Sequence, residues 1–381
     1  MLHKHPKLFC DPQIDYPIYD LSLNFADYIQ KSKTIIANTR QDLHKNAECI
    51  IDANSPFEMR PANKPRYGAL LIHGLLDSPF IMRDIGEHLR SQGILVRSIM
   101  LPGHGTVPGA LLNVTYAEWL QAVRYGIAAL KTDVEKLFLV GFSTGASLSI
   151  VHAAEDPAIV GLVMVSPATK INSPFAFAAN WFKQFSFGWQ RGKWLYAGRE
   201  IDYAKYRSIT FNAVYQVYQL GKLVEKIDAK KLAHCPQFIA LSYEDKIVCS
   251  QTTIKSFEEN THSTNRMLLY SGEKINYANQ RIEVRNSSYP ELGITNFCHI
   301  TVPVAPNNPH YGPDGDYTLA SHIDPIKFSY GAYDKIDTLF YQTLYRLKLT
   351  KLIRRRLTFN PDFEFFMTRL DKFIVENYPC E

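Results

Sequence analysis

The amino-acid sequence predicts a three-layer α/β fold with a mainly parallel central sheet and a helical insertion. Short apolar runs alternate with amphipathic helical patterns four times between residues 67 and 167. Such alternation is typical of βαβ units with right-handed crossovers, which place helices on both faces of a parallel sheet. An aromatic-rich stretch at 170–233 interrupts the pattern, which resumes at residue 237. The interruption is therefore interpreted as an insertion within one core.

The composition supports a large buried core and excludes several classes of protein. The 381 residues are 46% hydrophobic and 13% aromatic, with a formal net charge of +5. This apolar content excludes a disordered chain. Because lysine and arginine are scattered through most of the sequence, no nucleic-acid partner is expected.

Targeting and cysteine signals point to a reduced, soluble compartment. The first ten residues, MLHKHPKLFC, hold no apolar h-region, and no run of about 18 apolar residues occurs, so neither a signal peptide nor a membrane span is expected. The six cysteines lie far apart with no CxxC pair, which argues against a zinc site or a disulfide framework. We predict free thiols and a cytoplasmic protein.

The elements of the first half follow from periodicity and from glycine and capping signals. Residues 20–50 have helical spacing, and 57–62 is short enough for an edge strand. The run at 67–74 is apolar and stopped by glycine, which predicts a strand buried inside a parallel sheet. Thr115 is a candidate N-cap for a helix at 115–133. The same criteria predict helices at 80–93 and 144–155 and strands at 94–101, 136–142 and 159–167.

The second half divides into the insertion, the resumed core and a C-terminal extension. Aromatic residues crowd the insertion, which we interpret as a mostly helical cap. Strands are predicted at 237–245, 266–271 and 281–287, and helices near 250–260 and at 333–347 and 362–378. The predicted organisation is an N-terminal extension (1–60), a core (61–169 and 234–350), a helical cap (170–233) and a C-terminal helical extension (351–381).

A nucleophile motif stands between a predicted strand and a predicted helix. Residues 141–145 read Gly-Phe-Ser-Thr-Gly, which is G-x-S-x-G in the context that this motif requires. A sharp strand-to-helix turn forces Ser143 toward unfavourable φ/ψ, and the flanking glycines let the neighbouring backbone pack closely. The helix N-terminus adds a partial positive field, and the backbone N–H of Thr144 points at developing negative charge. Ser143 is therefore the candidate nucleophile.

Two further turns complete a resemblance. The strand at 67–74 ends in His73-Gly74, followed by LLDSP, and residues 101–105 read LPGHG. Together with the Ser143 elbow, these turns resemble the α/β-hydrolase superfamily, in the branch of bacterial carboxylesterases and monoacylglycerol-lipase-like enzymes. The resemblance covers 66–170 closely and continues at 237–250. It implies a three-layer α/β-hydrolase fold, with the backbone N–H of Leu75 joining that of Thr144 as an oxyanion hole.

The two histidines of these turns, which lie before the nucleophile, are not expected to act as its base. His73 and His104 each lie in a turn of the resemblance motifs. We interpret both as structural imidazoles that bond to local backbone.

The acid is sought after the insertion, because α/β-hydrolases place Ser, then Asp or Glu, then His along the chain. The run QFIALSYEDKIV supplies Glu244 and Asp245 at the end of a predicted strand. The resemblance favours Asp245, because the family follows its acid with a small apolar pair, matched here by Ile247-Val248. Glu244 is the alternative.

The base must follow Asp245 and lie beyond a late strand. His299 follows the strand at 281–287 and an irregular linker, which is the position the fold supplies. His310, His322 and His262 are the alternatives, and His262 lies in a helix-to-strand connection. The stretch between Asp245 and His299 is longer than in typical members, and an extra hairpin around SGEKINYANQ (271–280) would account for the length.

These residues predict a serine hydrolase that cleaves carboxylic esters with a hydrophobic acyl group. Ser143, His299 and Asp245 would form the triad, with no metal or organic cofactor. Aromatic side chains of the cap would suit a lipid-like ester, such as a monoacylglycerol or lysophospholipid. The alternatives are a thioesterase or acyltransferase with the same triad, or a silent α/β-hydrolase that serves as a binding protein.

The basic stretch at 346–359 has two interpretations. A solvated helix end is the simpler one, and weak contact with an anionic membrane surface is the alternative. The sequence predicts no oligomeric state.

Overall fold

The computed structural model describes residues 6–44, 46–172, 190–319, 328–331, 340, 343–344, 346–351 and 353–378. The chain divides into two compact units. Unit 1 comprises Met1–Val163 and Ser173–Cys235, and unit 2 comprises Met164–Asn172 and Pro236–Glu381.

The sheet of unit 1 is parallel except at its edge. Its strands are β1 (Phe57–Met59), β2 (Tyr67–Ile72), β3 (Leu95–Ile99), β4 (Lys136–Phe142) and β5 (Ile159–Val165), in the order β1-β3-β2-β4-β5. β2 pairs with β3 and with β4 in parallel, whereas β1 pairs with β3 antiparallel. The predicted edge strand and the predicted parallel strands are therefore confirmed. The last two residues of β5 belong to unit 2.

Helices cover both faces of this sheet, as alternate side chains of one strand show. Gly86 of α4 packs against Leu71, whereas Gly126 of α5 packs against Leu70. Successive residues of a strand point to opposite faces, so α4 and α5 lie on opposite sides of β2. The predicted three-layer arrangement follows.

Local signals set the ends of the helices in unit 1. Thr115 caps α5 in a capping box, because its side chain accepts from the N–H of Glu118 while the Glu118 carboxylate accepts from the N–H of Thr115. The helices are α1 (Pro6–Phe9), α2 (Phe25–Thr39), α3 (Ala47–Asn54), α4 (Arg83–Ser91), α5 (Tyr116–Leu130), α6 (Thr144–Ala153) and α8 (Phe211–Val224), with 3-10 turns η1 (Pro79–Met82), η2 (Pro108–Leu112), η3 (Gln190–Lys193) and η4 (Ala229–Leu232).

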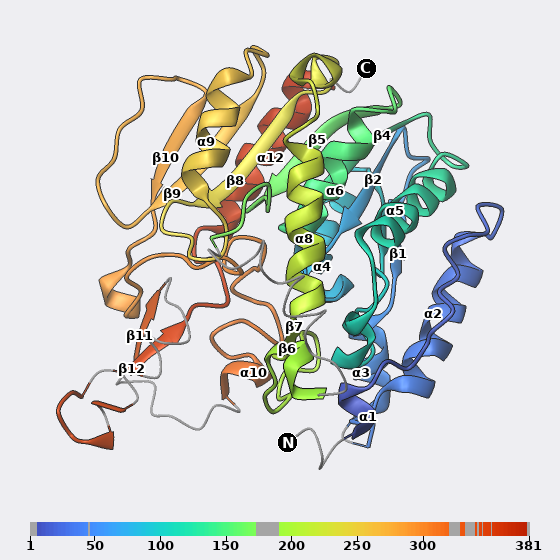
Figure 1. Cartoon of the computed structure of the whole chain (residues 1–381). Coiled ribbons are helices and arrows are strands. Elements are labelled where there is room, and N and C mark those ends of the chain that lie inside the picture. Colours follow the sequence, from blue (N-terminus) through green and yellow to red (C-terminus); the bar gives the residue numbers. More distant parts are fainter. Residues whose placement is uncertain are drawn as a thin grey trace. The chain divides into compact units, whose positions relative to one another are not determined.

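In unit 2, β8, β9 and β10 pair in parallel in that order, and β11 pairs with β12 in parallel as a separate two-stranded sheet. The predicted C-terminal helix, α12, packs on this sheet through Phe366 and Phe373, whose rings lie 6.0 Å and 5.6 Å from that of Phe238 (Figure 1). The elements are β8 (Gln237–Ser242), α9 (Ser250–Glu259), β9 (Arg266–Ser271), β10 (Ile282–Asn286), η5 (Pro290–Leu292), α10 (Asp316–Leu319), β11 (Phe328–Gly331), β12 (Ile353–Arg356) and α12 (Phe363–Asn377).

The connection between β9 and β10 differs from the sequence prediction. The two strands pair in parallel, with Ile282 opposite Met267, so the predicted hairpin is wrong. A hairpin would need antiparallel strands, whereas residues 272–281 carry the chain back to the start of the next strand. A turn-rich segment between two strand signals does not distinguish these two connections.

Part of the insertion and part of the C-terminal region lie outside the described residues. The described part of the insertion contains the antiparallel pair β6 (Trp194–Tyr196) and β7 (Ile209–Thr210), followed by α8. The aromatic residues at 173–189 and most of the predicted helix at 333–347 fall outside, so the cap and the domain boundaries stay predictions.

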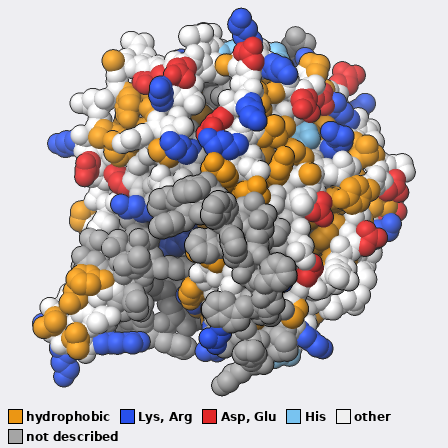
Figure 2. Space-filling model, viewed as in Figure 1, with side chains coloured by type: hydrophobic (Ala, Val, Ile, Leu, Met, Phe, Trp, Pro, Cys, Tyr) orange, Lys and Arg blue, Asp and Glu red, His pale blue; other side chains and the backbone are white. Residues whose placement is uncertain are grey.

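The surface and the helices give two further findings. Figure 2 shows lysine and arginine side chains interspersed with aspartate and glutamate on the viewed face. Within the described ranges, no helix combines the length and the apolar character needed to cross a bilayer.

Candidate active site

Ser143 occupies a strained turn between β4 and α6. It is the N-cap residue of α6, with φ 54° and ψ −114°, and only 6% of its surface is exposed. A non-glycine residue at positive φ costs free energy that the surrounding structure must offset, and such strain concentrates at functional sites. The strand-to-helix turn expected from the sequence is confirmed.

Glycine is required on both sides of this elbow. A Cβ added at Gly145 would lie 2.1 Å from the carbonyl oxygen of Ile72, and one added at Gly141 would lie 2.4 Å from Cα of Ala146. Both neighbours are backbone atoms, which a rotamer change cannot move. The glycines therefore let the start of α6 pack directly on β2 and β4.

The turn at residues 73–77 holds Leu75, the predicted oxyanion donor, so we call it the oxyanion turn, and it lies against the elbow in unit 1. A Cβ added at Gly74 would lie 3.0 Å from Cβ of Ser143. Leu75 follows Gly74, so its backbone N–H belongs to the segment next to the serine. Thr144 is the first residue of α6, where backbone N–H groups lack intrahelical partners. Of the two candidate oxyanion donors, Thr144 thus follows Ser143 directly in the chain, and Leu75 belongs to a turn that lies against it in space.

His73 is a buried structural imidazole, as expected. The N–H of Leu101 donates to Nε2 of His73 over 3.1 Å, so Nδ1 carries the proton and donates to the carbonyl of Gly74 at 2.9 Å. This side chain is fully buried, and desolvation lowers its pKa to about 4. The neutral ring thereby joins β3 to the oxyanion turn.

His104 is held in the same way, next to His73. Its Nδ1 bonds to the carbonyl of Pro102 at 3.1 Å, and its ring lies 5.0 Å from that of His73. Burial lowers its pKa to about 3. Both imidazoles are neutral at physiological pH.

Asp245 and His299 form a buried pair in unit 2. Nδ1 of His299 lies 2.6 Å from Oδ2 of Asp245, and the two residues are 6% and 5% exposed. The other oxygen of Asp245 accepts from the N–H groups of Ile247 (2.8 Å) and Val248 (3.1 Å). A carboxylate so bonded orients Nδ1–H toward itself, which leaves the lone pair of the imidazole on Nε2.

Two contacts hold the backbone around this pair. Oγ of Ser242, the last residue of β8, donates to the carbonyl of Phe297 at 2.8 Å. Nδ2 of Asn172 donates to the carbonyl of Val248 at 2.9 Å, and its backbone N–H donates to Ile247 at 2.8 Å. The loop that carries His299 and the turn that carries Asp245 are therefore both tied to unit 2.

The alternative residues have other partners. Glu244 accepts from Oγ of Ser271 at 2.9 Å and from the N–H of Gly272 at 2.8 Å, so its carboxylate closes the end of β9. Nδ1 of His310 bonds to Asp316, six residues later at the start of α10. His262 bonds to Thr264 in the helix-to-strand connection, and His322 lies outside the described residues.

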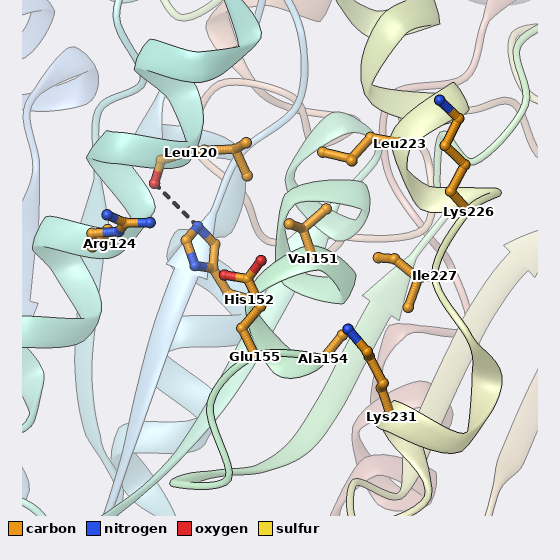
Figure 3. A pocket seen from close by; sticks show the side chains of 10 residues that line it. All are labelled: Leu120, Arg124, Val151, His152, Ala154, Glu155, Leu223, Lys226, Ile227 and Lys231. Atoms are coloured by element: carbon orange, nitrogen blue, oxygen red, sulfur yellow. Dashed lines mark hydrogen bonds between the residues drawn. The ribbon is translucent and has the colours of Figure 1, made fainter.

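A cavity of about 290 Å³ opens between α5, α6 and α8, away from the elbow (Figure 3). Its α6 residues lie at the C-terminal end of that helix, whereas Ser143 caps the N-terminal end, roughly 15 Å away at the rise of a helix. Nε2 of His152 donates there to the carbonyl of Leu120 at 3.1 Å. The lining residues are Leu120, Arg124, Val151, His152, Ala154, Glu155, Leu223, Lys226, Ile227 and Lys231.

One ion pair at the oxyanion turn was not predicted from the sequence. Nζ of Lys205 lies 2.5 Å from Oδ1 of Asp77. Asp77 stands four residues after His73 and was visible within the resemblance motif. Lys205, however, belongs to the insertion, where no local pattern indicates its partner.

Comparisons with known proteins give a family and several relatives. The family model described as "Serine aminopeptidase, S33" (Hydrolase_4) matches residues 63–273, more than half of the chain. A thermostable monoacylglycerol lipase of Bacillus sp. (strain H-257) is 28% identical over 203 residues, which are 52% of this chain and 77% of that protein.

Similar solved structures include two lipases. A soluble variant of monoglyceride lipase from Saccharomyces cerevisiae, in complex with a substrate analog, is 16% identical with a TM-score of 0.46, over 57% of this chain and 82% of that one. The monoacylglycerol lipase of Paleococcus ferrophilus is 21% identical with a TM-score of 0.46, over 57% and 88%.

The resemblance drawn from the elbow and the two turns is thus confirmed by the family match. The predicted mainly parallel sheet and the predicted enzyme class agree with it. The chain belongs to the S33 serine aminopeptidase family (Hydrolase_4), and it is a serine hydrolase with the α/β-hydrolase fold.

Proposed function

We propose that this chain hydrolyses carboxylic esters with a hydrophobic acyl group, using Ser143, His299 and Asp245 as its triad. The observation that carries the proposal is the strained serine at the N-terminus of α6, packed between two glycines that tolerate no side chain. The buried bond between His299 and Asp245 supports the base and the acid.

The proposed reaction has two stages. Oγ of Ser143 attacks the ester carbonyl while Nε2 of His299 takes its proton. The N–H groups of Leu75 and Thr144 donate to the oxyanion, and Asp245 accepts from Nδ1–H of the imidazolium. His299 then protonates the leaving alcohol, and water repeats the sequence to release the carboxylic acid.

An ester with an apolar acyl chain is favoured by similarity. The Bacillus relative that matches 52% of this chain is named a monoacylglycerol lipase. Cleavage of a small lipid ester by this triad needs no metal or organic cofactor. A thioester would react by the same route, and transfer to another alcohol would replace only the attacking water.

A substrate panel tests the proposal. We expect p-nitrophenyl esters of increasing acyl length and a monoacylglycerol to be hydrolysed. An acyl-CoA thioester and an aminoacyl p-nitroanilide should react more slowly. Ser143→Ala should lower kcat at least about 10³-fold, because binding and the oxyanion hole alone leave little catalysis.

Ser147→Ala is the matched control for folding. Ser147 lies one turn further along α6, is fully buried, and its hydroxyl has no hydrogen-bond partner among the described residues. It should keep wild-type activity. Faster cleavage of the p-nitroanilide would indicate an aminopeptidase, and faster cleavage of the thioester would indicate a thioesterase. A folded wild type that is inactive on the whole panel would support the silent binding protein instead.

A further inference from the structure

The oxyanion turn is strained, and its internal hydrogen bonds do not reach the strained residue. Leu76 has φ 69°, a left-handed value that a leucine rarely adopts. Within the turn, Nδ1 of His73 donates to the carbonyl of Gly74 at 2.9 Å, and the N–H of Asp77 reaches the same carbonyl at 3.3 Å, a long bond. Neither bond involves Leu76, so the contact that fixes the strained residue comes from another part of unit 1.

Two consecutive residues of the insertion bind two consecutive residues of this turn. The N–H of Tyr206 donates to the carbonyl of Leu76 at 2.8 Å. Nζ of Lys205 donates to Oδ1 of Asp77 at 2.5 Å. These bonds fix the two residues that directly follow Leu75, whose N–H is the proposed oxyanion donor.

The segment that makes these bonds, residues 202–207, is itself held by hydrogen bonds to other parts of unit 1, and we call it the strap. Nδ2 of Asn54 donates to the carbonyl of Tyr203 at 2.8 Å. The N–H of Thr106 donates to the hydroxyl of Tyr206 at 2.7 Å. The carboxylate of Glu200 accepts from the N–H of Arg207 at 2.7 Å and closes the loop. The strap thus bonds to α3 and to the loop after β3 on one side and to the oxyanion turn on the other, so it links their positions.

The charges of the central contact are buried. The side chain of Lys205 is 14% exposed and that of Asp77 is 3% exposed. A buried ion pair contributes little net stability over an apolar pair, because desolvation offsets the attraction, whereas its geometry is specific. The pair is therefore better suited to fix a position than to stabilise the fold.

We infer that Lys205 is a positioning residue for catalysis: through Asp77, and with Tyr206 on Leu76, it holds the Leu75 N–H in line with the elbow. The inference rests on the proposed oxyanion role of Leu75 and extends it to the insertion. Because this ion pair joins the insertion to the oxyanion turn, the position of the Leu75 N–H also depends on the position of the insertion.

Lys205→Met tests the inference, with Arg97→Met as its matched control. Arg97 is also a buried cation of unit 1, 3% exposed and paired with Glu58 and Asp133, but it has no bond to the oxyanion turn. We expect Lys205→Met to lower kcat for a p-nitrophenyl ester at least tenfold with KM within about twofold. Loss of a whole oxyanion donor costs about 10²–10³-fold. Arg97→Met should lose stability and keep kcat within about twofold.

Inhibition by a trifluoromethyl ketone separates positioning from a general loss of structure. Its adduct with serine carries an oxyanion, so its Ki should rise in Lys205→Met by about the factor that kcat falls, while KM changes little. The double variant Asp77→Asn/Lys205→Gln replaces the ions by neutral amides and should recover part of kcat. No recovery would overturn the inference, because Lys205 would then act on the reaction without Asp77.

Hydrogen exchange tests the same inference without any activity. The backbone amides of residues 74–77 should exchange faster in Lys205→Met than in wild type. In Arg97→Met, their exchange rates should equal those of wild type. A folded Lys205→Met with wild-type kcat, Ki and exchange would overturn the inference and leave the proposed function intact. An inactive wild type with accelerated exchange in Lys205→Met would instead count against the proposed function alone.

Discussion

At the scale of residues, two adjacent carboxylates have different surroundings. Asp245 bonds to an imidazole and to two backbone N–H groups, whereas Glu244 closes the end of β9. Both acids lie in the turn after β8, which ends at Ser242, and the alternation of strand side chains does not extend there. A sequence that offers both acids therefore does not say which of them reaches the histidine. The resemblance favoured Asp245, and the bond to His299 is the observation that supports that choice.

Conservative substitutions should separate the two acids. Asp245→Asn should lower kcat by about 10³–10⁴-fold, because an amide no longer orients Nδ1–H or balances the imidazolium. Glu244→Gln should lower the unfolding free energy while kcat changes less than tenfold. Kinetics on one p-nitrophenyl ester, with urea denaturation of each variant, measure both effects. The reverse pattern would assign the acid to Glu244.

At the scale of elements, the sequence predicted the features that depend on neighbouring residues, such as helix caps and buried strands. Thr115 caps α5 where the sequence placed an N-cap, and the elbow turns at Ser143. The strands β2, β3 and β4 were recognisable because strands buried on both faces are continuously apolar. The parallel pairing of β9 with β10 was not, because pairing direction depends on how the connection runs in space. Lys205 and Asp77 are 128 residues apart, and no hydrophobic periodicity or local motif in the sequence indicates that they bond.

Close packing at the elbow makes a prediction at this scale. Gly145→Ala should destabilise the protein by several kcal/mol and abolish activity, because its Cβ would overlap the carbonyl oxygen of Ile72. Gly86→Ala in α4 is the control. Its Cβ would meet a side-chain methyl of Leu71 at 3.1 Å, and alanine favours helix by about 1 kcal/mol. Thermal unfolding measures both, and equal stabilities would contradict the packing account.

At the scale of the whole molecule, buried neutral histidines link stability to pH. Desolvation lowers the pKa of His73 and His152 to about 4 and that of His104 to about 3. The unfolded chain binds these protons near pH 6.5, whereas the folded chain does not bind them until pH 4 or below. The unfolded state therefore holds more protons in this window, and stability falls as the pH drops through it.

The unfolding free energy should thus decrease steadily between pH 6.5 and 4, as urea denaturation at a series of pH values would show. A shift of about 2.5 pKa units corresponds to about 3 kcal/mol for His152. His152→Gln can keep a donor to Leu120 but cannot titrate, so its pH dependence should be shallower by about one proton. An unchanged slope in this variant would contradict the assignment of His152 as a buried neutral group.

The central claim is that Ser143 and the pair of His299 with Asp245 work as one reaction centre. The rate of covalent labelling by a fluorophosphonate, with the modified peptide identified by mass spectrometry, tests it most directly. We predict labelling at Ser143 in wild type, a rate at least about 100-fold lower in His299→Ala, and a near wild-type rate in His310→Ala. Wild-type labelling of Ser143 in a folded His299→Ala variant would contradict the account.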